Sequence, residues 1–158
     1  MSNKYDQYVK HPPHLRLSMK SDKSVFFDGW MAKEEQLGTD FTFGHQFVRK
    51  AFKGDNPTHS HNFWEFMAWY GSNPDDPDDF DAEVWFYFGK ELEKHVFTRP
   101  TIISLPPNLI HHPFEIVRLG SPIIQIEIMI GNKGVPVMPY FEKDKDWSPG
   151  GKINREIL

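Results

Sequence analysis

Two histidines and one glutamate are spaced so that they could bind a metal ion together. His59 and His61 flank a single residue, and Glu65 follows four positions after His61. Alternate side chains of an extended strand point to the same face, so these three would project together. A chain with eight histidines contains about 0.4 His-x-His pairs by chance, and about 0.025 with the glutamate added. Imidazole and carboxylate groups suit Zn, Fe, Mn or Ni, so the pattern predicts a metal site. The alternative is a solvated strand face with incidental histidines.

A second cluster, Pro106-x-Asn108-x-x-His111, follows later in the chain. The two clusters resemble the two conserved motifs of the cupin superfamily, which stand here as Gly54…His59-x-His61-x-x-x-Glu65…Gly71 and Pro106-x-Asn108-x-x-His111. The resemblance covers about residues 40–130. It implies a jelly-roll barrel with one divalent metal ion per chain (Fe, Mn, Ni, Zn or Co), held by four ligands: His59, His61, Glu65 and His111.

The sequence departs from the family pattern at four points. The first motif is one residue shorter than usual on either side of its ligands, at Gly54 and at Gly71. Asn108 occupies the position where the family usually has glycine. Because Asn is the next best residue for a positive φ, the same turn remains available. Glu115 stands where the second motif often ends in Asn.

Several other residues are candidates for contact with a substrate. His45 belongs to a strand that leads to the site, with packing or contact with solvent as the alternative. Phe63 and Met67 share the predicted ligand face of their strand. Gln125 and Glu127 alternate with isoleucines, and the pattern leaves open which of the two faces looks into the barrel. If it is the polar face, both residues reach the substrate.

Glu115 is the candidate for a catalytic acid or base. Counting by twos from His111 places it on the same strand face, if no bulge intervenes. A carboxylate at the rim of the barrel is the alternative. His112 directly follows His111 and would point to the opposite face, so we expect it outside the site, at the surface or an interface.

The elements that must position these residues are short strands. Aromatic residues make up 15% of the chain, beside 13 Pro and 11 Gly, which is typical of strands between frequent turns. The pattern predicts one helical turn at 34–37 and strands at 24–30, 41–52, 59–70, 83–88, 94–98, 101–105, 112–119 and 123–130. Two hairpins are expected, 83–88 with 94–98 and 112–119 with 123–130. The predicted class is all-β, a sandwich or small barrel.

The chain of 158 residues has the size of one domain. We expect a polar N-terminal arm at 1–23, the barrel at 24–131, and a C-terminal tail at 132–158 that packs on the barrel. Cysteine is absent, which excludes disulfides and thiolate metal sites.

The charge balance gives no reason to expect a nucleic-acid partner. Lys and Arg number 18 against 22 Asp and Glu, a net charge of −4. We find no apolar run long enough to span a membrane and no stretch like a signal peptide. The sequence therefore predicts a soluble cytoplasmic protein with neither a membrane nor a nucleic acid as partner.

The predicted strand 59–70 is apolar on both faces. Trp64, Phe66 and Tyr70 lie on the face opposite the ligands. A strand exposed to water on one side would be polar there, so either the N-terminal arm or a second subunit covers it. Because cupins of this size are often dimers, we expect a homodimer.

A metalloenzyme acting on a small oxygenated metabolite is the leading hypothesis. A metal held without thiolates polarises a carbonyl or carboxylate, or chelates an enol or catechol, as in a dioxygenase, an isomerase or a lyase. The alternative is a non-catalytic domain that binds or senses a small ligand through the metal. A barrel that serves only oligomeric structure is a third hypothesis.

Overall fold

The computed structural model describes residues 4–54, 56–76, 78–140 and 153–157. The elements in chain order are a 3-10 turn η1 (Asp6–Tyr8), β1 (His14–Met19), β2 (Val25–Ala32), α1 (Glu34–Leu37), β3 (Phe41–Val48), β4 (Phe52–Lys53), β5 (His59–Ser60), β6 (Trp64–Gly71), β7 (Ala82–Phe88), β8 (Glu93–Phe97), β9 (Thr101–Leu105), β10 (His111–Leu119), β11 (Ile123–Ile130), β12 (Met138–Pro139) and β13 (Ile153–Ile157).

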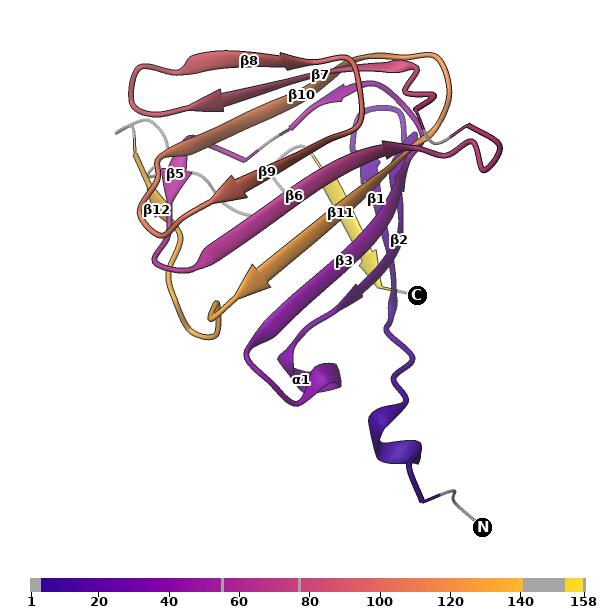
Figure 1. The fold of residues 1–158 in the computed structure, drawn as a ribbon, viewed down its shortest axis with the longest axis vertical. Helices are drawn as coiled ribbons and strands as arrows, with labels where there is room; N and C mark the ends of the chain where they lie inside the picture. The colour runs from indigo at the N-terminus through magenta and orange to yellow at the C-terminus, as the bar shows by residue number, and fades with distance from the viewer. Residues whose placement is uncertain (1–3, 55, 77, 141–152, 158) are drawn as a thin grey trace.

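The strands form two sheets that pack face to face (Figure 1). The first sheet has the order β13-β1-β2-β3-β11-β6-β9, and the second has the order β12-β5-β10-β7-β8, with β4 also paired to β10. All the pairs are antiparallel. The core lies between the sheets, where Phe26 and Trp69 of the first meet Phe86 and Phe114 of the second. The predicted all-β sandwich is confirmed.

Local signals place several elements where the sequence predicts them. Residues 34–37 form the single helical turn α1, which ends at Gly38 because its φ of 70° suits glycine. The hairpin of β7 and β8 pairs as expected. Gly54 packs so closely on β10 that an added Cβ would lie 2.9 Å from the Phe114 carbonyl oxygen. Asn108 has the positive φ, 68°, that the turn before His111 requires.

The predicted continuous strand 59–70 is wrong. The chain leaves the second sheet after β5, bends at Asn62 and Phe63, and joins the first sheet as β6. The main chain of His61 forms no strand ladder there, and its carbonyl oxygen instead accepts a hydrogen bond of 2.8 Å from the Asn108 N–H. The alternation argument for a shared ligand face therefore does not apply across this bend.

The predicted hairpin of 112–119 with 123–130 is also wrong. β10 pairs with β7 in the second sheet, whereas β11 lies between β3 and β6 in the first. The turn at Gly120, Ser121 and Pro122 connects the two sheets instead of two neighbouring strands. A short link between apolar strands fits both arrangements, and only the packing of the whole sandwich distinguishes them.

The predicted boundary between arm and barrel at residue 24 needs correction. Residues 14–19 form β1, which pairs with β2 and with β13 inside the first sheet. In the predicted tail, β12 pairs with β5 and β13 with β1, while residues 141–152 and 158 lie outside the described residues. No helix among the described residues is long and apolar enough to cross a membrane.

Candidate metal centre

The structure brings His59, His61, Glu65 and His111 together although they come from both sheets. His59 in β5 pairs directly with His111 at the start of β10. Glu65 lies near the start of β6 in the first sheet, and His61 lies on the segment that crosses between the sheets. All four side chains are buried.

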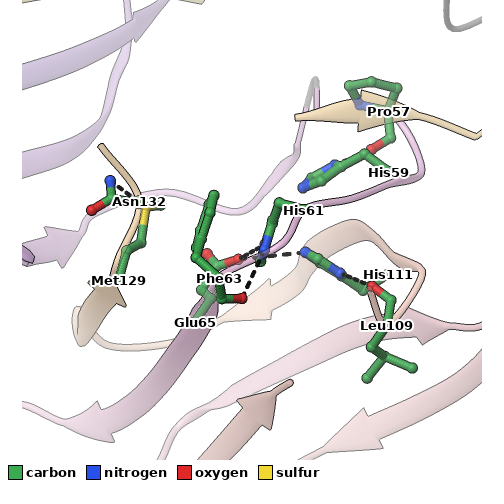
Figure 2. A network of polar contacts seen from close by, with 9 residues as sticks. All are labelled: Pro57, His59, His61, Phe63, Glu65, Leu109, His111, Met129 and Asn132. Atoms are coloured by element: carbon green, nitrogen blue, oxygen red, sulfur yellow. Dashed lines mark hydrogen bonds and ion pairs between the residues drawn. The ribbon is translucent and has the colours of Figure 1, made fainter. Parts of the chain in front are cut away.

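The three histidines present the same ring atom to one another. Nδ1 of His59 donates to the Pro57 carbonyl oxygen at 2.7 Å, Nδ1 of His61 to that of Phe63 at 3.1 Å, and Nδ1 of His111 to that of Leu109 at 2.8 Å (Figure 2). A carbonyl oxygen only accepts, so Nδ1 carries the proton in each ring. In each neutral ring Nε2 therefore has a free lone pair, the form in which imidazole binds a metal.

The donor atoms are close enough to share one ion. The three histidines each offer a ring nitrogen within 4.8 Å of the others. Oε2 of Glu65 lies 2.9 Å from Nε2 of His61 and 3.4 Å from Nε2 of His111. Ligands that share an ion at about 2.1 Å lie about 3.0 to 3.4 Å apart. Nε2 of His111 has no hydrogen-bond partner among the described residues, so this buried atom also fits a metal ligand.

The burial of the site controls its charges. Burial and the neighbouring His111 lower the pKa of His59 to about 4, so its ring is neutral at pH 7. Burial alone would raise the pKa of Glu65, but the imidazoles of His111 and His61 outweigh it and hold that pKa below its usual range. At neutral pH the site therefore combines a carboxylate with the neutral imidazole of His59, as a divalent cation requires.

The inner face of β11 is the polar one, which answers the question that the sequence leaves open. Gln125 and Glu127 line a cavity of about 290 Å³ between the sheets, together with Met67 and Glu65. A further cavity of about 210 Å³ shares Glu65 and Glu127 and reaches His59, His61 and Phe63. The Phe63 ring stacks on His61 at a centroid distance of 3.7 Å.

Two expected site residues lie elsewhere. A register shift between His111 and Phe114 breaks the count by twos, so Glu115 faces outward, where its carboxylate pairs with Lys53 Nζ at 2.9 Å. The expectation that Glu115 shares the ligand face is therefore wrong. His45 also points away from the cavity, because the inward positions of β3 are its even-numbered neighbours, and its ring contacts Trp30 and Phe47.

His112 lies inside the sandwich, against expectation. Its φ of 71° breaks the strand alternation, so that both His111 and His112 are buried. Its ring stacks on His59 at 4.7 Å and borders both cavities. Burial and the nearby His59 and His111 lower its pKa well below the ordinary value. The signal in the sequence is Pro113, since proline within a strand marks an irregularity.

The cavity wall also contains polar residues that the sequence did not reveal as candidates. Gln46 is buried, and its Oε1 has no hydrogen-bond partner among the described residues. Asn132 donates to Thr42 Oγ1 at 3.0 Å. It also donates to Met129 Sδ at 3.5 Å (Figure 2). Thr42 and Gln46 alternate with aromatic residues along β3, and that alternation is the signal that could have found them.

Comparison with known proteins identifies the architecture. No protein-family model matches the chain, and no curated protein matches it. The cupin 2 domain-containing protein from Halorhodospira halophila is similar with a TM-score of 0.51 and 9% identity, over 82% of this chain and 86% of that one. The polyketide cyclase RemF from Streptomyces resistomycificus is similar with a TM-score of 0.50 and 12% identity, over 89% and 84%. At such identities the similarity concerns the fold alone, and it confirms the predicted jelly roll.

Proposed function

We propose that this chain, which has the cupin fold, binds one divalent metal ion and acts as an enzyme on a small oxygenated metabolite. The ligands would be four residues: His59, His61, Glu65 and His111. The observation that carries the proposal is the set of three Nδ1–H bonds to backbone carbonyls, because they leave Nε2 of all three rings free to bind an ion, and two of these atoms, in His61 and His111, lie within 3.4 Å of Glu65 Oε2. A structural histidine cluster has no need for all three rings in this one tautomer.

The chemistry assigned to the bound ion is polarisation of a carbonyl or carboxylate, or chelation of an enol or catechol. The chain itself supplies the binding site for the organic part. The wall of the cavity combines apolar side chains such as Phe26, Phe27 and Phe114 with the polar groups of Gln46, Gln125 and Glu127. Apolar side chains exclude water, and the few polar groups fix the orientation of a ligand. A volume of about 290 Å³ suits a small metabolite.

One observation favours the alternative, a non-catalytic domain that binds a small ligand through the metal. The acid or base candidate Glu115 lies outside the barrel, paired with Lys53. Without it, proton transfer would depend on Glu127 or His112, which border the cavity. A ligand that binds to the metal-loaded protein without being converted would support this alternative.

Metal analysis of the purified protein tests the proposal. We expect close to one equivalent of a divalent metal in the wild type and less than about one tenth of that in His111→Ala, because loss of one ligand opens the site. His95→Ala is the matched control, since its ring lies on the exposed hairpin beside Glu93 and should leave the metal content unchanged.

The identity of the metal then selects the reaction. Iron directs the next assay to oxygen consumption with catechols and enolic acids, whereas Mn, Ni, Zn or Co directs it to isomerase and lyase substrates. Equal metal contents in the wild type and His111→Ala, or a wild type that takes up no added metal, would contradict the proposed site.

A further inference from the structure

Two glutamines lie side by side on the inner face of the first sheet. Gln46 of β3 is paired across the strands with Gln125 of β11, and both line the cavity of about 290 Å³. Both side chains are buried. Side chains directly opposite on antiparallel strands have Cβ atoms about 5 Å apart, so the two carboxamides form one polar patch, which we call the glutamine pair. Buried polar groups are normally hydrogen-bonded, so the partners of the pair indicate what it can bind.

The glutamine pair is remote from the histidine cluster. β3, β11 and β6 lie side by side in Figure 1, and their register aligns Glu65 with Met129, four residues after Gln125. Four residues of a strand span about 13 Å. A ligand that reaches both the predicted metal ion and the glutamine pair therefore has a second polar group, well separated from the one that binds the ion.

The carboxamide of Gln125 is held in one orientation. Its Oε1 accepts a hydrogen bond of 2.9 Å from Nε1 of Trp69, the buried residue paired with Gln125 on its other side. An indole nitrogen can only donate, so the amide oxygen lies at this end and the amide nitrogen at the other. The bond to Trp69 therefore leaves Nε2 of Gln125 as a donor for a ligand in the cavity.

Gln46 supplies the complementary acceptor. Its Oε1 is buried and has no hydrogen-bond partner among the described residues. Its Nε2 lies 2.7 Å from the position that a Cβ on Gly44 would occupy, so the carboxamide uses the space that glycine leaves. Gly44 is paired with Glu127, and beside a carboxylate the amide nitrogen is favoured over the oxygen. The oxygen is thus left to accept a hydrogen bond from a ligand.

The glutamine pair therefore matches a group that carries both a donor and an acceptor. A ketone or a carboxylate offers acceptors only, and either would leave Oε1 of Gln46 buried without a partner. A carboxylate also brings a negative charge toward Glu65 and Glu127. Lys33 is the only lysine or arginine among the described residues that line the cavity, and it is exposed.

We propose that Gln46 and Gln125 determine the specificity of the cavity by binding a neutral carboxamide, either a primary amide or a lactam. The N–H of the ligand donates to Oε1 of Gln46, and its carbonyl oxygen accepts from Nε2 of Gln125. A carboxamide carries its donor and acceptor on two atoms, as two neighbouring glutamines require. That the other end of the ligand reaches the metal rests on the proposed function, whereas binding at the glutamine pair requires no metal.

Titrations of chelator-treated protein with benzamide, acetophenone and benzoate test this specificity. The three probes share one ring, which suits the phenylalanines of the cavity wall, and differ only in the group that the glutamine pair would bind. We expect benzamide to bind about tenfold more tightly than acetophenone, because the methyl ketone has no donor for Gln46. Benzoate should bind more weakly than benzamide. Chemical shifts of the 15N-labelled protein measure the three dissociation constants.

Two variants assign the preference to Gln46. Gln46→Met removes the carboxamide at similar length, so benzamide and acetophenone should bind within about twofold of each other. Gly44→Ala keeps the carboxamide but places a methyl group where its Nε2 lies, so the tenfold preference should fall below about threefold. Gln7→Met is the matched control, because Gln7 is exposed in η1 and the preference should remain tenfold.

The same spectra identify the folded variants, and Gly44→Ala decides the question if Gln46→Met does not fold. Equal affinities of the wild type for benzamide and acetophenone, or no saturable binding of benzamide, would overturn the proposal. So would tightest binding of benzoate, or a tenfold preference that persists in a folded Gln46→Met. Because these titrations are made without metal, such failures are distinguishable from a failure of the metal site, which the metal content of His111→Ala reports.

Discussion

The outward faces of β10 in the second sheet and β11 in the first differ in polarity. On the second sheet, Glu115 of β10 pairs with Lys53 at 2.9 Å, and Lys94 lies over the Trp85 ring at 3.7 Å from its centroid. On the first sheet, the corresponding positions of β11 are isoleucines. The inner faces of both sheets contribute to one core and differ much less. Core packing therefore constrains the inner faces alike, whereas it leaves the outward faces free to differ.

Large-to-small substitutions in the core should lower the free energy of unfolding by similar amounts in both sheets. Phe26→Ala in the first sheet and Phe86→Ala in the second each remove a fully buried ring, at an expected cost of about 3–5 kcal/mol in unfolding free energy. Urea denaturation measures both values. Val96→Ala, on an exposed strand, is the control and should cost less than about 1 kcal/mol. A cost below 1 kcal/mol for either phenylalanine would show that the two inner faces do not share one core.

Acidification should weaken the contact between the sheets at the histidine cluster. Burial and His111 lower the pKa of His59 from 6.5 to about 4. The unfolded chain then binds more protons than the native one between these values, so metal-free protein loses stability as pH falls from 6.5 to 4. His59 alone accounts for about 3 kcal/mol at 1.36 kcal/mol per pKa unit. Below pH 4.5, protonation of Glu65 acts in the same direction, because its pKa is also lowered.

Urea denaturation of chelator-treated protein at pH 7, 5.5 and 4 measures this dependence. His59→Gln should have a shallower slope between pH 6.5 and 4, because it lacks the titrating ring. His95→Gln is the matched control, since that ring is exposed beside Glu93. A slope that His59→Gln leaves unchanged would contradict the assignment.

The smallest effect should come from the charged outward face of the second sheet. Lys53→Gln removes the partner of Glu115, but the lysine is 70% exposed. Exposed ion pairs contribute about 0–1 kcal/mol, so thermal denaturation should change by a few degrees at most. A loss above 2 kcal/mol would mean that this face depends on its charges, and the contrast between the two outward faces would then need revision.

Local residue patterns account for the parts of the fold that were predicted correctly. The end of α1 depends on Gly38, and the turn before His111 depends on Asn108. Strand 123–130 follows from its own alternating composition. The choice of sheet is different, because it depends on packing across the whole molecule. Both failures, at the bend after β5 and at the turn before β11, lie where the chain crosses between the sheets.

The candidate site was predicted for a reason that the structure does not support. A single strand was expected to align His59, His61 and Glu65, whereas a bend and two sheets bring them together. The motif resemblance pointed to these residues without depending on that geometry. His112 was missed because its positive φ follows from local backbone detail that a strand pattern does not contain.

Alternate residues of β11 face the cavity and the outer surface, so a substitution on this strand affects one of the two and not the other. Gln125, Glu127 and Met129 border the cavity, and the isoleucines between them face outward. A point substitution at an odd-numbered position alters the wall of the cavity without touching the opposite surface, and one at an even-numbered position does the reverse. The cavity wall and the outer surface can therefore diverge independently in descendants of this sequence, although one strand of eight residues carries both.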